Sequence, residues 1–503
     1  MTVPPEQTTG DPSEALTFEA GGVDEVSVVP WPLMLHRRIA RRLGARITPS
    51  PWLVLVVALA GLFTVSFTIT LLAVSLKSIA KDLHSSDTTL TWVITGPMLA
   101  FGVVGPALGK AGDLWGHKRL FLFSLSGAAV FAALTALSWN ALSLIVFRVI
   151  GAGIGSATGP ASMAMISRVF APEARAKALG YWSMTGAAAP VLGVVAGGPA
   201  VDSVGWRVIF IVQAPLCLVG IVLAAWLLPE TARGARSRFD IKGAAFLGLG
   251  ITSLLLALNR GGAWGWTHPV VPAGFLLGAL ALVSFVRAEQ QAPDPLIPLR
   301  YFRLRNFSAP IANQFLANFA YMGGFILTPL LLEDGLGYTT SHAGLLVVAR
   351  PLAFAIAGPL AGYVTMRIGE RSSGVSGALL VGGSMVLLSA VGLGTSDVFI
   401  VAALALSGIG LGISAPAMAA TIANTVDLRD LGIAGATQQL MTQVGVIAGI
   451  QIMQTVQVSQ AGTHGLIASY GTAYLVGAGV SVLAALCALG VRSRRPTFTS
   501  SPL

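Results

Sequence analysis

Long apolar runs alternate with short polar loops along most of this 503-residue chain. A helix needs about 20 apolar residues to cross the roughly 30 Å hydrocarbon core of a bilayer. Because a helix satisfies its own backbone hydrogen bonds in lipid, the runs predict membrane-spanning helices. The predicted ranges are 52–76, 89–109, 120–138, 141–166, 177–201, 208–228, 241–259, 271–287, 309–332, 341–364, 374–392, 396–424, 432–456 and 468–490. The expected fold class is an all-α integral membrane protein with about 14 transmembrane helices.

The segment before the first run is polar and then basic. Residues 1–29 carry six acidic side chains and no Lys or Arg, which predicts a disordered tail and no cleavable signal peptide. Residues 36–46 then hold five arginines, and Leu35, Ile39 and Leu43 recur at every fourth position. Two interpretations remain open: a short helix lying on the inner leaflet, or a topology signal ahead of the first span.

Two sets of six runs resemble each other. The segment 109–118 after the second run is echoed by 362–371, and Pro160 is echoed by Pro416. Parallel halves built around a midplane cavity are a transporter design. The predicted domains are a tail and basic segment at 1–50, a six-helix bundle at 51–230, two extra spans and an inner loop at 231–308, a second six-helix bundle at 309–492 and a tail at 493–503.

Charge sets the orientation. Only 10% of the residues are charged and the mean hydropathy is +0.77, whereas a soluble protein carries about 25% charged residues. If both termini are cytoplasmic, the outer loops hold only four of the 31 Lys and Arg residues, which are Lys77, Lys81, Arg207 and Arg260. This asymmetry predicts cytoplasmic termini in a multi-pass protein of the plasma membrane. The formal charge of +10 is scattered over short loops, so nucleic acid is not an expected partner.

The chain shows no pattern for catalysis or a cofactor. Cys217 and Cys487 each lie alone in an apolar run, whereas a zinc site needs about four clustered ligands. No nucleophile–base pair stands out among the spans, so we expect neither an enzyme nor a bound metal or cofactor.

A series of motifs follows the predicted spans in order. The loop between spans 2 and 3 holds Gly109, Asp113, Gly116, His117, Lys118 and Arg119, and span 4 holds Arg148. Span 5 carries Gly186, Pro190, Gly193, Gly197 and Gly198. Further positions lie at the entry to span 6 (Gly205, Trp206, Arg207) and in the extra pair (Asp240, Gly243, Gly262, Trp264, Gly265, Trp266). This series resembles the motifs of the major facilitator superfamily, in its fourteen-span drug:proton antiporter branch, with His117 in the first basic position of the family's loop motif.

The resemblance implies an inner gate and a flexible seam. The loop carboxylate Asp113 would lie beside exposed helix N–H groups and pair with Arg175, the family's usual partner position. The alternative is a static loop anchor. In the second half Met366 occupies the acidic position, so a latch is expected in the first half only. The glycines around Pro190 would let the two halves approach closely, and plain helix packing remains an alternative for them.

The chain departs from the family pattern in span 1. The acidic companion expected for Arg148 is replaced by Thr68, and no Asp or Glu falls near the middle of any predicted span. Proton antiport normally uses a buried carboxylate, so the site of coupling is open. Glu333 and Asp334, at the outer end of span 9, would serve only if that span runs deeper. Arg148 and Arg350 are the two cations within spans, and they suit an acidic amphipathic substrate.

Neutral polar residues complete the expected cavity. Gln314, Asn318 and Tyr321 share one face of span 9, and Gln439 and Gln443 share one face of span 13. Such amides either join helices or contact substrate. Three more members of the predicted cavity are Thr68, Gln213 and Trp92.

Three functions remain open on the sequence. The first is a secondary active exporter of small amphipathic compounds, coupled to protons and working as a monomer by alternating access. The second is an uncoupled facilitator or a transporter of lipids or anionic metabolites. The third is a membrane sensor that does not transport.

Overall fold

The computed structural model describes residues 50–68, 79, 82–85, 92–230 and 240–492. Within them the chain forms helices and turns and no strand. The expectations for the two tails, for the basic segment at 36–46 and for the second half of span 1 lie outside the described residues. Residues Pro49–Leu503 form one compact unit.

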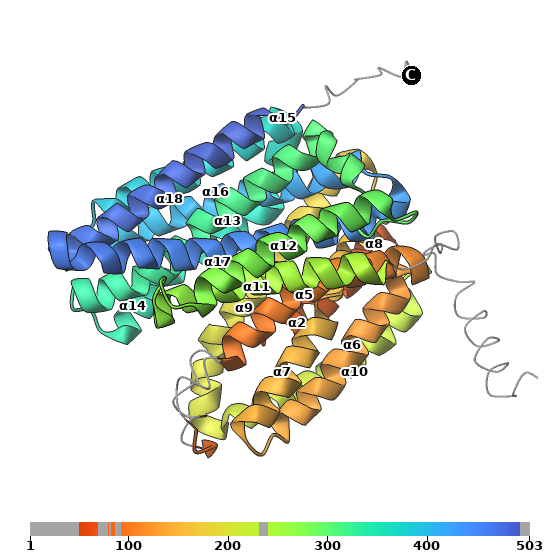
Figure 1. The fold of residues 1–503 in the computed structure, drawn as a ribbon, viewed down its shortest axis with the longest axis horizontal. Helices are drawn as coiled ribbons and strands as arrows, with labels where there is room; N and C mark the ends of the chain where they lie inside the picture. Colours follow the sequence, from red (N-terminus) through yellow and green to blue (C-terminus); the bar gives the residue numbers. More distant parts are fainter. Residues whose placement is uncertain (1–49, 69–78, 80–81, 86–91, 231–239, 493–503) are drawn as a thin grey trace, which may run out of the picture. The chain divides into compact units, whose positions relative to one another are not determined.

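The first lobe contains seven described helices. They are α2 (Pro51–Ser66), α5 (Trp92–Trp115), α6 (His117–Ala136), α7 (Ala141–Gly155), α8 (Thr158–Val169), α9 (Pro172–Val204) and α10 (Trp206–Leu227). Asn140 and Ser143 form a capping box that starts α7, which fits the strong preference for Asn at this position. The single predicted span 141–166 is broken near Ser156 into α7 and α8. In Figure 1, α6, α7 and α10 lie together at the lower right.

The second lobe is also all-helical, and some of its helices are longer than those of the first lobe. Its helices are α13 (Arg305–Leu330), α14 (Thr340–Val347), α15 (Ala349–Ser389), α16 (Asp397–Thr425), α17 (Leu431–His464) and α18 (Leu466–Leu489). Short turns of helix flank α13 and α17: η3 (Leu299–Arg303), the π-helix η4 (Leu331–Gly335) and η5 (Leu428–Asp430). The chain turns within α15 at Gly369, whose φ of 83° suits glycine, so α15 covers two predicted spans.

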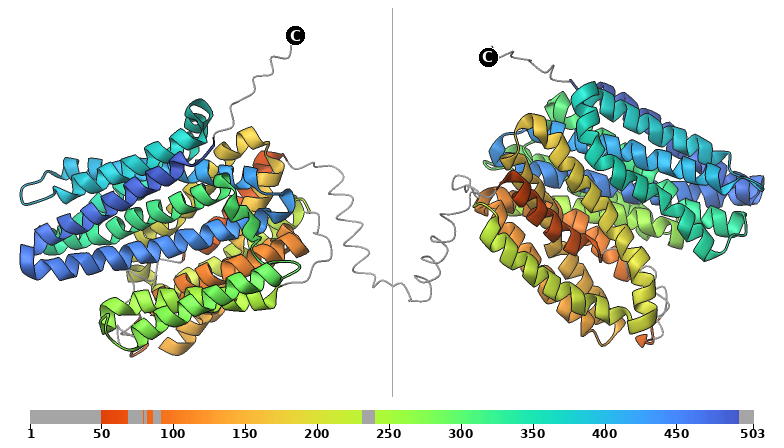
Figure 2. Two further views of the ribbon diagram at one scale, coloured as in Figure 1. Left: turned by 45° about the horizontal axis from the view of Figure 1, so that its top comes forward. Right: turned by 180° about the vertical axis from the view of Figure 1, so that it is seen from behind.

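The extra pair bridges the lobes. Helices α11 (Ile241–Trp264) and α12 (Val270–Gln291) pack on each other, and α11 also contacts α5 and α17. Leu247 and Leu255 of α11 share one apolar cluster with Leu99 of the first lobe and Leu440 of the second. Figure 2 shows the orange helices of the first lobe together and the blue helices of the second lobe together, with the green pair against both.

The helices are suited to a bilayer. Among the described residues, nine helices are long and apolar enough to cross a membrane. Every predicted span overlaps a described helix, and the number of crossings stays a prediction. Many large apolar side chains lie exposed on α10, α12 and α18, as expected for helices that face lipid rather than water.

Candidate functional site

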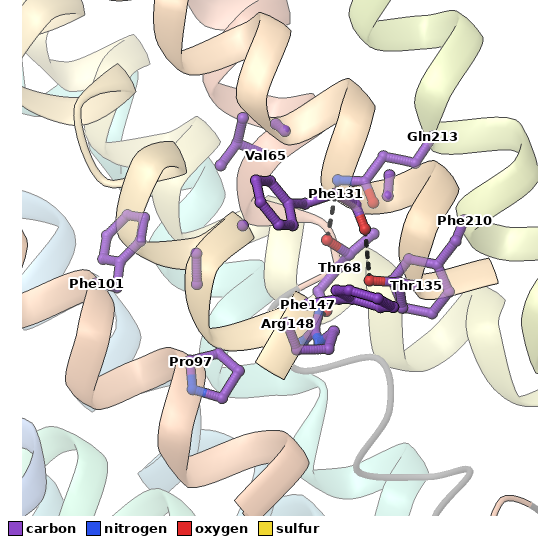
Figure 3. A pocket seen from close by; sticks show the side chains of 14 residues that line it. Val65, Thr68, Pro97, Phe101, Phe131, Thr135, Phe147, Arg148, Phe210 and Gln213 are labelled. Atoms are coloured by element: carbon purple, nitrogen blue, oxygen red, sulfur yellow. Dashed lines mark hydrogen bonds between the residues drawn. The ribbon is translucent and has the colours of Figure 1, made fainter. Parts of the chain in front are cut away.

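A polar cluster lies inside the first lobe. Arg148 of α7 is 7% exposed and donates from Nη2 to the backbone carbonyl of Thr68 at 3.0 Å. The Gln213 amide of α10 donates to Oγ1 of Thr68 at 3.1 Å. Arg148 also lies over the ring of Phe210, 5.5 Å from its centre. Figure 3 shows Thr68, Arg148 and Gln213 directed toward one another. The structure thus places three predicted cavity residues together.

These three residues line a cavity of about 40 Å³, walled by side chains of α2, α5, α6, α7 and α10. A cavity needs about 10–15 Å³ to hold one water, so this one accommodates a few waters and no drug-sized compound. In this conformation it is therefore a polar chamber within one lobe.

A second buried cation lies inside the other lobe. Arg350 of α15 is 0% exposed and donates from Nη1 to the carbonyl of Tyr321 at 2.9 Å. Its guanidinium lies 5.4 Å from the centre of the Tyr321 ring. Within the described residues its Nε and Nη2 have no hydrogen-bond partner and it makes no ion pair. A buried charge left in this way is costly, so Arg350 holds donor capacity that a ligand anion would satisfy.

The predicted polar faces occupy two different environments. Asn318 of α13 donates to the backbone carbonyl of Gln314 at 2.8 Å, one turn before Tyr321. On α17, Gln439 lies against Gly159 of α8, and Gln443 lies against Gly102 of α5. The span 13 amides therefore sit where the two lobes meet.

Trp92 occupies another place. It lies at the start of α5 with Arg260 of α11 4.3 Å from its ring centre, and it is absent from the lining of the described first-lobe cavity. Its visible role is to join α5 to the extra pair through a cation–π contact.

Asp113 bridges the lobes at the predicted cytoplasmic end. Its carboxylate accepts hydrogen bonds from the backbone N–H of Gly432 at 2.8 Å and of Ile433 at 2.7 Å, at the start of α17. His117, the first residue of α6, lies 3.1 Å from the same carboxylate. The predicted pairing of Asp113 with exposed helix N–H groups is thus present, and the helix dipole adds to it.

The other predicted gate residues in the loop motif make no hydrogen bond to α17 among those described, and two of the glycines shape the backbone around the Asp113 contact. Gly109 packs so closely on Gly432 and Ala436 that a side chain there would collide with α17. Gly116 has φ 101°, a backbone conformation that glycine tolerates best. Lys118 is half-buried and Arg119 is exposed on the following turn.

The Asp113–Arg175 pair that the resemblance implies is not among the ion pairs of the described residues, and Arg175 instead makes a second contact between the lobes. It donates to Oδ1 of Asn424 at 2.6 Å, at the end of α16, and to the carbonyls of Phe170 and Ala423. Nearby, Arg168 donates to the carbonyl of Leu428 at 2.7 Å. The predicted cytoplasmic ends of the lobes are therefore joined at several points.

Among the described residues of α9, the close contacts with α15 lie earlier than the predicted motif. A Cβ on Gly180 would meet the backbone of Gly358, and one on Gly362 would meet Lys177. Gly186 faces open space, with no atom within 4 Å of where its Cβ would be. Gly193 is buried in α9, and the surroundings of Pro190, Gly197 and Gly198 lie outside the described residues.

Sequence reasoning missed several of these residues. Asn424 has no local signal, since a single amide at a span end is common. Gly180 and Gly358 belong to no motif, and the start of α17 gives no sign that its amides have a partner. One residue in the sequence did point to this contact between the lobes. His117 stands where the loop motif has a permanent cation, and it lies beside Asp113.

Known proteins resemble this chain along most of its length. The family model of the Major Facilitator Superfamily matches residues 56–340 and 311–502. The tetracenomycin C resistance and export protein of Streptomyces glaucescens is 30% identical over 421 residues, which cover 82% of this chain and 77% of that protein. The probable actinorhodin transporter of Streptomyces coelicolor is 27% identical over 481 residues, covering 93% and 79%.

A solved structure shares the fold. The human organic anion transporter MFSD10 superposes with a TM-score of 0.64 at 18% identity, covering 88% of this chain and 100% of that one. Together with the helices described above, these matches confirm the predicted all-α membrane fold and the resemblance on which it was based. The chain is a multi-pass transporter of the cell membrane and not an enzyme. It belongs to the Major Facilitator Superfamily.

Proposed function

We propose that this transporter exports small amphipathic compounds across the plasma membrane by alternating access. In this scheme the two lobes rock about a midplane site, opening it to one side at a time. One relative is named for resistance to and export of tetracenomycin C and another as a probable actinorhodin transporter, and the export named for the first supports the proposed direction.

The observation that best supports the rocking motion is the contact between Asp113 and the start of α17. A carboxylate that is only 5% exposed binds the N-terminus of a helix from the other lobe through two short hydrogen bonds. Such a contact is strong while the lobes are together, and water replaces it once they part. A latch of this kind can therefore hold one state without preventing the other.

The substrate class follows from the two buried arginines. Arg148 and Arg350 each bring a guanidinium into the interior of one lobe, and Arg350 keeps Nε and Nη2 without a partner among the described residues. Guanidinium groups match carboxylates and phosphates in geometry. We therefore propose acidic amphipathic compounds as substrates, reached when the chambers open.

The driving force has two candidates. Glu333 is half-buried in the π-turn that ends α13, a kind of helix irregularity frequent at functional sites, so it is our candidate for proton coupling. The second candidate function is an uncoupled facilitator. The specific feature in its favour is Thr68, which hydrogen-bonds Gln213 where the antiporter branch carries an acid.

Uptake into proteoliposomes separates these possibilities. Acidic and cationic amphipathic compounds would be offered to the purified protein with and without an imposed pH gradient, and uptake measured by mass spectrometry. We expect Arg350→Gln to lower uptake of acidic compounds roughly 10- to 150-fold, since a hydrogen bond to a charged group contributes about 1.5–3 kcal/mol. Arg260→Gln is the matched control, because it removes a guanidinium that lies on Trp92, outside the described first-lobe cavity.

Three results decide the matter. Unchanged acid uptake in both Arg350→Gln and Arg148→Gln would refute the acidic substrate class. Uptake that ignores the pH gradient and survives Glu333→Gln would favour the facilitator. Binding of compounds without any flux would refute export itself.

A further inference from the structure

A second hollow lies at the predicted cytoplasmic end of the other lobe. It has a volume of about 470 Å³ and is formed where η3 meets α13, at the end of α16 and beside Arg492 after α18. With Glu370 of α15, four segments distant in sequence therefore meet around it. This hollow is distinct from the first-lobe cavity, with which it shares no lining residue.

The hollow is strongly basic. Arg303, Arg305 and Arg492 line it, and among the described lining residues Glu370 is the only acid. None of these four side chains forms an ion pair within the described residues. Three guanidinium groups around one space repel one another, and an anion between them would remove that cost.

Neighbouring acids are already engaged. Asp427 and Asp430 pair with Arg300 at 3.3 and 3.5 Å, and Arg429 also reaches both. Tyr301 donates to Asp430 at 2.6 Å. Burial and this hydrogen bond raise the pKa of Tyr301 to about 12, so the phenol stays a donor. Asp427 and Asp430 thus neutralise Arg300 and Arg429. The arginines that line the hollow are left for another partner.

The walls of the hollow are fixed by hydrogen bonds. The Asn306 side chain accepts from the backbone N–H of Arg492 at 2.8 Å and donates to its carbonyl at 3.0 Å. Thr425 donates to the carbonyl of Asn306 at 3.2 Å. The segment after α18 is thereby held against the start of α13, which keeps Arg492 and Arg305 at the same hollow. Basic residues that only set the orientation of the chain in the membrane need no fixed positions, because the positive-inside rule depends only on which side they lie.

We propose that this hollow binds a phosphate-bearing anion through Arg303, Arg305 and Arg492. Arginine forms paired hydrogen bonds to phosphate oxygens. Basic pockets between helices on the cytoplasmic side of membrane proteins suit anionic lipid headgroups, and a soluble phosphate ester offers the same chemistry. Asn424 both lines the hollow and accepts the hydrogen bond from Arg175 of the first lobe, so occupancy would favour the closed inner end.

Binding to the full-length protein tests the proposal. Native mass spectrometry in detergent would measure retention of phosphatidylglycerol against phosphatidylcholine, and calorimetric titration would measure binding of glycerol 1-phosphate. The site variant is Arg305→Gln with Arg492→Gln. The matched control is Arg367→Gln with Arg371→Gln, which removes the same charge beside Gly369 on the same face, outside the hollow.

We expect the site variant to weaken phosphatidylglycerol binding roughly tenfold or more relative to the control, since hydrogen bonds to charged groups are lost. If glycerol 1-phosphate binds with the same dependence and the lipid does not, the site stands and its ligand is soluble. Equal weakening by both variants means diffuse surface charge and overturns the proposal, as does absence of binding by either ligand. Should the site variant fail to fold, Arg305→Lys with Arg492→Lys keeps the charge, and an affinity equal to wild type would refute paired arginine recognition.

Discussion

Replacing Asp113 by Asn should open the predicted cytoplasmic end of the protein. The carboxylate accepts from Gly432 and Ile433 at 2.8 and 2.7 Å, and both bonds cross between the lobes. Asn keeps one oxygen acceptor of nearly the same shape but loses the second oxygen and the charge. The change therefore removes the latch with little change in volume.

The magnitude follows from these two bonds. A hydrogen bond to a charged group contributes about 1.5–3 kcal/mol, and a charge at a helix N-terminus adds about 0.3–1 kcal/mol. Losing one bond and the charge should cost the closed state about 2–4 kcal/mol. In the open state the side chain is hydrated in either form, so the loss shifts the equilibrium toward opening by roughly 30- to 1000-fold.

Thiol labelling in inside-out vesicles measures this shift. Ser167 of α8 is 0% exposed and lies one turn after Met163, whose sulfur packs against Gly435 of α17. A Ser167→Cys reporter, in a background with Cys217→Ala and Cys487→Ala, should react with an impermeant maleimide only when the lobes part. We expect Asp113→Asn to raise the labelling rate by at least tenfold.

The matched control is Asp427→Asn. Asp427 is an exposed carboxylate on the same face, and its ion pairs with Arg300 and Arg429 stay within the second lobe. If Asp113→Asn labels no faster than this control, the carboxylate is a static loop anchor and the latch is refuted.

Three further outcomes are expected. Thr68→Asp should make substrate uptake depend on the pH gradient, because it places a carboxyl beside the buried arginine of α7; an unchanged pH profile would exclude this position from coupling. Gly180→Val should drive its side chain into the α15 backbone and raise labelling of Ser167→Cys, whereas Gly186→Val, which meets open space, should leave labelling unchanged. Gly116→Ala should lower the unfolding temperature, since a non-glycine residue at φ 101° costs about 1–3 kcal/mol; an unaltered thermal unfolding curve would contradict this.

Much of the fold could be predicted from the chain alone. Each apolar run overlaps a described helix, and the loop motif marks Asp113 as a carboxylate suited to exposed helix N–H groups, without saying which helix supplies them. That Arg148 is buried inside its lobe also follows, because a cation within a span is costly when it faces lipid. These features depend on length, charge and short-range spacing.

Which helix meets which was decided by the tertiary structure alone. The α17 partner of Asp113, the place of Gly180 against α15, the bridging position of α11 and the basic hollow at Arg305 all join segments far apart in sequence. In a soluble protein the apolar face of a helix marks its buried side. In lipid both the buried and the exposed faces are apolar, so hydrophobic periodicity carries little information about packing, and close contacts between small residues settle it.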